Sequence, residues 1–430
     1  MTVVALALVA LFALLFWGVP LGFGMGIVGV IGFASVIGWG PAFHTVGQIA
    51  YDSVLNYNLS VVPLFVLMGQ LFAHSRMADE LYEASHAFVG HLRGGMAMAT
   101  IFACGAFSAV SGSSLACAAA MTTVAAPNMR KFNYDDGFAA GTIAAGSTLD
   151  ILIPPSIVMV IYAIITNVEL GKLMIAGFLP GLLMIVCYVA AIVVVARIWP
   201  HLGPAGERSS WRERARALSH VWAMVLLFGV SLGGIYVGVF TPTEAAGVGA
   251  FGAFAIAMAR RRLGVKSFLN MLADATATTS TIFFVVIGGL IFANLVTVSG
   301  AGEAIQVWVK GLGLSQFALM LALLGIYIVL GCVLDASAMT ILTVPIFFPI
   351  VVQAGIDPIW FGIFIIVVVG IGLIHPPMGM LLLIVKSLIP NLSMKDLLKG
   401  IAPYLVADML AIGLMMVFPQ IVLVLPRLMP

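Results

Sequence analysis

Residues 105–164 read GAFSAVSGSSLACAAAMTTVAAPNMRKFNYDDGFAAGTIAAGSTLDILIPPSIVMVIYAI, and two of their features cannot belong to an ordinary membrane-spanning helix. The first is Ser111-Gly112-Ser113-Ser114, a polar tip between two apolar arms that are each too short to span a bilayer. The second is Pro154-Pro155-Ser156, which interrupts an otherwise apolar run. Because proline has no backbone N–H, the helix must break there and leave carbonyl groups unpaired. Unpaired carbonyls inside a bilayer must line a cavity or bind something, so the stretch predicts a re-entrant hairpin facing a broken helix.

The composition of the whole chain indicates a polytopic membrane protein. Its 430 residues are 62% hydrophobic and 8% charged, whereas soluble chains carry about 25% charged residues. A net charge of +2 is too small to suggest nucleic-acid binding. Four cysteines lie in apolar segments without metal-ligand spacing, which is typical of small buried side chains; they are Cys104, Cys117, Cys187 and Cys332.

The apolar segments predict spans of about 20 residues each. We expect them near residues 2–17, 20–38, 59–75, 135–165, 172–197, 219–238, 240–260, 279–298, 356–386 and 402–425. Two of these, 135–165 and 356–386, are long because each is broken in the middle. Hairpins of two half-spans are predicted at 95–130 and 314–354. Amphipathic connectors along the membrane surface are expected at 42–57, 77–92, 264–277 and 300–312.

One clearly soluble stretch, residues 198–218, divides the chain into halves that cover 1–197 and 219–430. The halves repeat, because three pairs of landmarks share one spacing: Pro20 with Pro242, Pro154 with Pro376, and Ser113 with Asp335. The separations 242 − 20, 376 − 154 and 335 − 113 all equal 222, which indicates an internal duplication.

Basic residues predict the orientation of the halves. A cluster in the central stretch places that stretch in the cytoplasm; it consists of Arg208, Arg212, Arg214 and Arg216. Arg93, Arg130 and Lys131 flank the first hairpin, which is therefore expected to enter from the cytoplasm. The second hairpin has only Lys310 nearby and is expected to enter from outside, with both chain termini also outside. The first basic residue is Arg76, so we expect residues 3–17 to be a true span and not a cleaved signal. Repeats inverted in this way suit alternating access.

Five motifs, in this order, resemble the large membrane subunit of TRAP (tripartite ATP-independent periplasmic) transporters. They are Ser108-Ala109-Val110-Ser111-Gly112-Ser113-Ser114, Leu152-Ile153-Pro154-Pro155-Ser156-Ile157, Thr241-Pro242-Thr243-Glu244-Ala245-Ala246, Leu334-Asp335 and Pro376-Pro377-Met378-Gly379. The resemblance implies an all-α polytopic fold of two inverted repeats, with two re-entrant hairpins and two broken helices, as in elevator-type ion transporters. It implies sodium symport of a small organic acid into a bacterium, and no enzyme activity.

The resemblance also implies partners and a location in the bacterial inner membrane. The expected partners are a small four-helix membrane subunit and a soluble periplasmic substrate-binding protein. Substrates in the family are mostly organic acids such as dicarboxylates, keto acids and sialic acid. No small-subunit sequence is visible at either end, so we expect the unfused form.

The first hairpin tip and the first break together predict a sodium site, because sodium prefers oxygen ligands and the break supplies free carbonyls. By resemblance the ligands are carbonyl or hydroxyl oxygens of Ser111 and Ser114 and the carbonyls of Asp150, Ile153 and Pro155. The alternative is that these small residues only permit close helix packing.

Inverted symmetry predicts a second sodium site, so that at least two sodium ions and no organic cofactor are expected. Its residues are Gly331, Gly372, His375 and Met378. His375 stands where the family usually has threonine. Its backbone carbonyl could still coordinate sodium, while its ring could equally be a packed, hydrogen-bonded core residue.

Asp150 departs from the glycine that is usual in the family, and an acid at this depth is a candidate for function. It could bind sodium, carry a proton, contact a substrate hydroxyl, or cap the second half-helix. Glu244 follows a proline at a helix start, where a capping role is favoured. Substrate is expected between the two tips, at Ser113, Ser114, Asp335, Ala336 and Ser337. The positive ends of half-helices would face its carboxylate there, and Asp335 could cap a helix or orient ligands.

Three other functions fit the sequence less well. A related sodium/dicarboxylate symporter that needs no binding protein would be expected to show Ser-Asn-Thr triplets at its tips, and this chain has none. An intramembrane protease needs a serine with a positioned base or two converging aspartates, which the chain does not offer. A channel is disfavoured because paired hairpins gate alternately and do not form a single pore.

Overall fold

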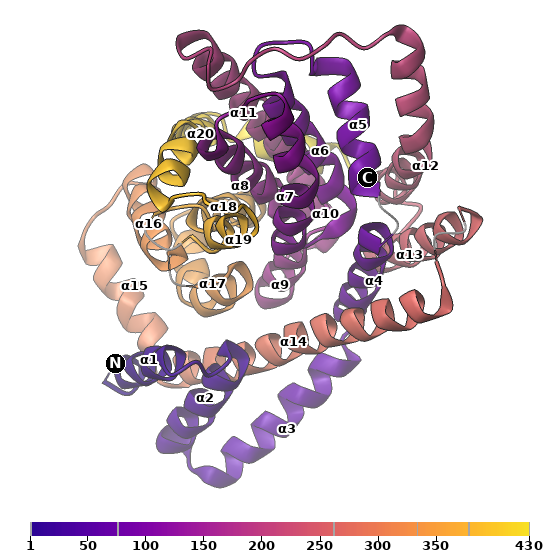
Figure 1. Cartoon of the computed structure of the whole chain (residues 1–430). Coiled ribbons are helices and arrows are strands. Elements are labelled where there is room, and N and C mark those ends of the chain that lie inside the picture. Colours follow the sequence, from indigo (N-terminus) through magenta and orange to yellow (C-terminus); the bar gives the residue numbers. More distant parts are fainter. Residues whose placement is uncertain (1, 75–76, 261–262, 333, 377–378, 430) are drawn as a thin grey trace.

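The computed structural model describes the chain except for residues 1, 75–76, 261–262, 333, 377–378 and 430, and every regular element in the described part is a helix. Seven of the described helices are long and apolar enough to cross a membrane, or eight if one bent pair counts as a single span. The predicted all-α polytopic fold is therefore confirmed. Figure 1 shows a bundle that contains both hairpins, with one long helix, α14, running along its side.

The first hairpin and the first broken helix form as predicted. Their helices are α6 (Gly95–Ser111), α7 (Ser114–Lys131), α8 (Asp136–Leu152) and α9 (Ile157–Thr166). Gly112 makes the turn between the arms with a φ of +63°, a conformation that glycine adopts without steric cost. Ser113 caps α7 by accepting a 3.4 Å hydrogen bond from the N–H of Ala116. Pro154 and Pro155 end α8, since neither can donate a backbone hydrogen bond.

The second half contains the equivalent elements. They are α16 (Gln316–Gly331), α17 (Ala336–Gln353), α18 (Pro358–Gly372) and α19 (Met380–Leu388). Asp335 caps α17 by accepting a 2.8 Å hydrogen bond from the N–H of Ala338, which bears out the expected capping role. Pro377 of the second break lies outside the described residues.

The remaining helices flank these elements. In the first half they are α1 (Thr2–Phe16), α2 (Leu21–Ile37), α3 (Trp39–Leu55), the short η1 (Tyr57–Ser60), α4 (Val61–His74), α5 (Met77–Val89), α10 (Leu170–Ala176) and α11 (Phe178–Ile198). In the second half they are α12 (Trp211–Tyr236), α13 (Pro242–Ala259), α14 (Val265–Val298), α15 (Ala301–Gly311), α20 (Met394–Val417) and α21 (Gln420–Leu428). The same contacts recur in the two halves. The contact of α2 with α14 corresponds to that of α13 with α4, and the contact of α7 with α19 corresponds to that of α17 with α9.

Four predicted boundaries differ from the structure. The connector at 264–277 and the span at 279–298 form one helix, α14, because no glycine or proline interrupts the chain between them. The span at 172–197 is divided into α10 and α11 at Gly177. The stretch 198–218 turns helical at Trp211, where Ser210 and Glu213 form a capping box. The predicted span at 402–425 covers parts of two helices. α20 starts earlier than predicted, after its cap Ser393, and ends at Val417, and α21 follows it.

A buried polar network ties three helices of the bundle together. The hydroxyl of Tyr188 in α11 donates a 2.6 Å hydrogen bond to Oδ1 of Asp408 in α20. The same hydroxyl lies 3.0 Å from the hydroxyl of Thr148 in α8. Asp408 is fully buried, with 0% of its surface exposed, and its Oδ2 atom has no hydrogen-bond partner. Asp408 therefore depends on Tyr188 for its hydrogen bond to a protein group.

We expect Tyr188→Phe to lower the free energy of unfolding by about 1–3 kcal/mol, because it leaves a buried carboxyl group without its donor. The measurement is the unfolding midpoint of purified protein in detergent. Tyr51→Phe is the matched control, since Tyr51 is exposed in α3 and should give the wild-type midpoint. Equal midpoints for Tyr188→Phe and wild type would contradict a stabilising role for this network.

Candidate functional site

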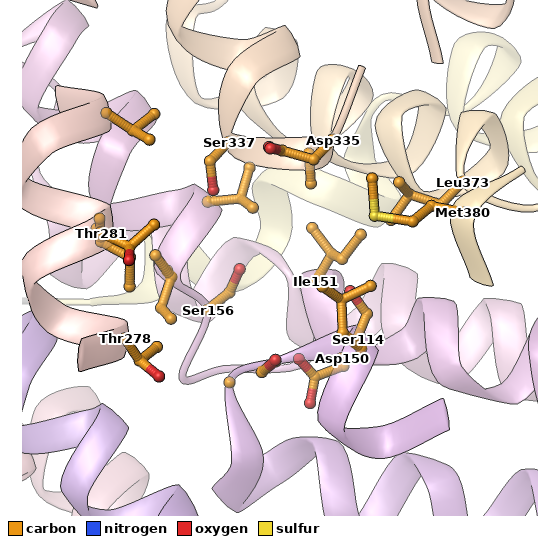
Figure 2. A pocket seen from close by; sticks show the side chains of 18 residues that line it. Ser114, Asp150, Ile151, Ser156, Thr278, Thr281, Asp335, Ser337, Leu373 and Met380 are labelled. Carbon is orange, nitrogen blue, oxygen red and sulfur yellow. The ribbon is translucent and has the colours of Figure 1, made fainter. Parts of the chain in front are cut away.

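A cavity of about 240 Å³ lies where the two hairpin tips approach the two breaks. Figure 2 shows Ser114 and Asp150 on one side of it and Asp335 and Ser337 on the opposite side. Its lining residues are Gly112, Ser113, Ser114, Leu115, Asp150, Ile151, Ser156, Ile157, Val158, Thr278, Thr281, Ile282, Val285, Asp335, Ala336, Ser337, Leu373 and Met380. All five residues predicted to bind substrate thus face one cavity.

The first tip packs directly on the first break. A Cβ atom built on Gly112 would lie 3.4 Å from the carbonyl oxygen of Pro155, which is van der Waals contact. The hydroxyl of Ser111 donates a 3.3 Å hydrogen bond to the carbonyl of Ser113, so the tip is also bonded within itself. On the other side, Gly69 of α4 lies so close to the carbonyl of Ser111 that a side chain there would collide with it. The tip is held between α4 and the break.

The break leaves oxygen atoms available near this tip. A helical carbonyl normally accepts from the N–H four residues later. For Asp150 and Ile151 those residues are Pro154 and Pro155, which have no N–H. The carbonyls of Asp150 and Ile151 are therefore free of the usual helical bond. The structure brings the predicted ligands Ser111, Asp150 and Pro155 to the same tip and break, as the sodium hypothesis requires.

Asp150 is buried, with 1% of its surface exposed, yet it lines the cavity. Its carboxyl group interacts with the Ser111 side chain, and its Oδ1 atom has no hydrogen-bond partner. Ser156 caps α9 by accepting a 3.5 Å hydrogen bond from the N–H of Met159, so the described cap of this helix does not involve Asp150. The sodium, proton and substrate alternatives stay open on this geometry.

At the second site the arms and the break touch through glycine. A Cβ atom on Gly372 would lie 2.6 Å from the Cα atom of Gly331, so neither position has room for a side chain. The thiol of Cys332 lies 3.3 Å from the carbonyl oxygen of Pro376, which places the tip beside the break. His375 is half-buried, and among the described residues its Nδ1 atom has no hydrogen-bond partner, so the alternative of a hydrogen-bonded ring finds no support at that atom. The predicted ligand Met378 lies outside the described residues.

Two lining residues, Thr278 and Thr281 of α14, were missed by the sequence analysis. Figure 2 shows them along a third side of the cavity, facing it from a helix outside both hairpins. The available signal was the hydroxyl-rich run Thr276-Ala277-Thr278-Thr279-Ser280-Thr281, which straddles the incorrect boundary between connector and span.

Glu244 behaves as predicted, since its Oε2 atom accepts a 2.8 Å hydrogen bond from the N–H of Thr241 at the start of α13.

Comparison with known proteins agrees with these features. Residues 8–421 match the family model described as "Tripartite ATP-independent periplasmic transporter, DctM component". The chain is 36% identical to the C4-dicarboxylate TRAP transporter large permease protein DctM of Pseudomonas aeruginosa, over 93% of each chain. It is 31% identical to the sialic acid TRAP transporter large permease protein SiaM of Vibrio cholerae, over 96% of each chain.

The fold also resembles a solved structure. The YdaH transporter of Alcanivorax borkumensis superimposes with a TM-score of 0.60, at 14% sequence identity, over 86% of this chain and 88% of that one. At this identity the likeness concerns the fold alone.

Proposed function

This chain belongs to the DctM family of tripartite ATP-independent periplasmic transporters, and on that basis we propose that it takes up a small organic acid by sodium symport. It is a multi-pass membrane permease subunit and not an enzyme. The single observation that supports the proposal most strongly is the cavity where two hairpin tips meet two broken helices. Secondary transporters hold substrate and ions where broken helices meet near the bilayer midplane.

Sodium would bind at each contact between a tip and a break. The first site would use oxygens of Ser111 and Ser114 with the carbonyls of Asp150, Ile153 and Pro155. Free carbonyls and hydroxyls suit a hard cation, and the close contact of Gly112 with Pro155 supports a shared site. The second site would use the backbone near the touching glycines; its residues would be Gly331, Gly372, His375 and Met378.

The organic acid would occupy the cavity itself. The N-termini of α7 and α17 lie beside it, at the caps Ser113 and Asp335. Positive helix ends and free N–H groups favour a carboxylate. Ser114, Ala336 and Ser337 line the same space.

Transport would follow an elevator movement of the hairpin bundle past α4 and α14. Glycines at the contacts with these two helices support such an arrangement, since Gly69 of α4 meets the backbone of Ser111 and Gly289 of α14 meets the side chain of Ile341. A small four-helix membrane subunit and a periplasmic binding protein would complete the transporter in the bacterial inner membrane. The first hairpin would enter from the cytoplasm, the second from the periplasm, and both chain termini would be periplasmic.

The test is uptake by proteoliposomes that contain this chain, its small subunit and its binding protein loaded with radiolabelled ligand. We expect uptake only with an inward sodium gradient. ATP should have no effect, because the chain lacks the Gly-x-x-x-x-Gly-Lys-Ser/Thr motif that cradles nucleotide phosphates. Equal uptake in potassium-only buffer would refute sodium coupling.

A further inference from the structure

The charges that face the cavity are unusual for the site of an organic anion. Among its described lining residues, Asp150 and Asp335 are acidic and none is Lys, Arg or His. Asp335 is compensated, because its carboxylate accepts a hydrogen bond from the first turn of α17. Asp150 has the Ser111 side chain beside it, but among the described residues its Oδ1 atom has no hydrogen-bond partner.

The backbone around Asp150 increases this imbalance. Asp150 lies in the last turn of α8, which ends at Leu152. The C-terminal end of a helix carries partial negative charge, so it disfavours a carboxylate and favours a cation. An ionised carboxylate at this negative helix end would be stabilised by a positively charged group in the adjoining cavity.

Sodium binding does not require this carboxylate. Gly372 occupies the position equivalent to Asp150, since 372 − 150 equals the repeat spacing of 222. The proposed second ion site therefore has no side chain at this position. Sodium at the first site would use the backbone carbonyl of Asp150, which leaves its side chain available to face the cavity.

The same cavity also offers places for an anionic group. The N-termini of α7 and α9 adjoin it and are capped by the neutral hydroxyls of Ser113 and Ser156, whereas the N-terminus of α17 already holds the carboxylate of Asp335. Thr278 and Thr281 add hydroxyl groups on the side formed by α14. The volume of about 240 Å³ is below the roughly 300–1,000 Å³ of pockets for drug-sized ligands, so a small substrate fits best.

We propose that the Asp150 carboxylate pairs with a positively charged nitrogen of the substrate, so that the transported acid is a small zwitterion. The substrate carboxylate would lie at the N-termini of α7 and α9, and its ammonium or quaternary nitrogen would lie at Asp150. A dicarboxylate would instead bring a second negative charge toward Asp150, which like-charge repulsion disfavours. This inference rests on the proposed function and specifies the substrate class of the same site.

The first part of the test identifies the ligand. The partner binding protein is screened by thermal shift against pairs that differ only in the charged nitrogen, glycine betaine with 3,3-dimethylbutyrate and 4-aminobutyrate with pentanoate, and against succinate. We expect the zwitterionic member of a pair to stabilise it and the carboxylate that lacks the charged nitrogen to fail. Stabilisation by succinate or by a carboxylate that lacks the nitrogen, or none by any zwitterion, overturns the inference.

The second part measures uptake of that zwitterion by the complete transporter. Asp150→Asn should reduce uptake at least tenfold, while the sodium concentration for half-maximal uptake stays within twofold of wild type. Asp52→Asn, at an exposed position in α3, is the matched control and should behave as wild type. Unchanged uptake in Asp150→Asn, or a large rise in its sodium requirement, overturns the inference. Sodium-driven uptake of an acid without a positive nitrogen would refute this inference alone, whereas uptake independent of sodium would refute the proposed function.

Discussion

Gly372→Val is expected to reduce sodium-driven uptake at least a hundredfold. The first added atom would lie 2.6 Å from the Cα atom of Gly331, which no real side-chain contact tolerates. The position of the added Cβ atom is fixed by the backbone of residue 372, and the Cα atom of Gly331 is itself a backbone atom, so no side-chain rotation can relieve the clash. Hairpin α16–α17 would have to move off the end of α18, and the second ion site would lose its shape.

The matched control is Gly370→Ala in the same helix. Its nearest neighbour, the Cβ atom of Thr148, would lie at an ordinary contact distance of 3.6 Å, so uptake should stay within about twofold of wild type. A single symmetric peak in gel filtration in detergent would show that both variants are folded. Wild-type uptake by Gly372→Val would show that the close contact of α16 with α18 is dispensable.

Combining Ser111→Ala with Ser114→Ala should raise the sodium concentration for half-maximal uptake at least tenfold. The two substitutions remove hydroxyl oxygens from the first tip, and losing a charge-assisted interaction costs about 1.5–3 kcal/mol. A tenfold change in affinity corresponds to about 1.4 kcal/mol. The measurement is initial uptake rate against sodium concentration at constant ionic strength.

Thr123→Ala is the control for this pair. Thr123 lies in the same helix as Ser114, is exposed, and bonds only to the carbonyl of Ala120, one turn away. Its sodium curve should match that of wild type. If the double variant also gave the wild-type curve, the hydroxyls of the first tip would have no part in ion binding.

Features set by local chemistry could be predicted from the sequence. A polar Ser-Gly-Ser-Ser tip and a Pro-Pro pair act on their own neighbours in the chain, through a left-handed turn at Gly112 and missing N–H groups at Pro154 and Pro155. Helix starts with capping residues, such as Ser113 and Asp335, also depend on neighbouring residues alone. The repeat spacing then placed the second hairpin opposite the first.

Features set by distant packing could not be predicted. Thr278 and Thr281 reach the cavity from α14, and nothing in their own segment shows which face of that helix meets the hairpins. The partner of Asp408 could not be predicted because Tyr188 lies 220 residues away along the chain. The length of α14 was misjudged for a different reason, since its first half is polar enough to resemble a surface connector.

We propose that the contact of the first tip with the first break forms a sodium site. Thermal unfolding of the purified chain in sodium chloride and in potassium chloride tests this directly. Sodium at a hundred times its dissociation constant should stabilise the folded protein by about 2.7 kcal/mol for one site. We expect a higher unfolding midpoint in sodium than in potassium at equal ionic strength, and a smaller difference when Ser111→Ala and Ser114→Ala are combined. Identical midpoints in the two salts for wild type, or the full difference retained in the double variant, would contradict it.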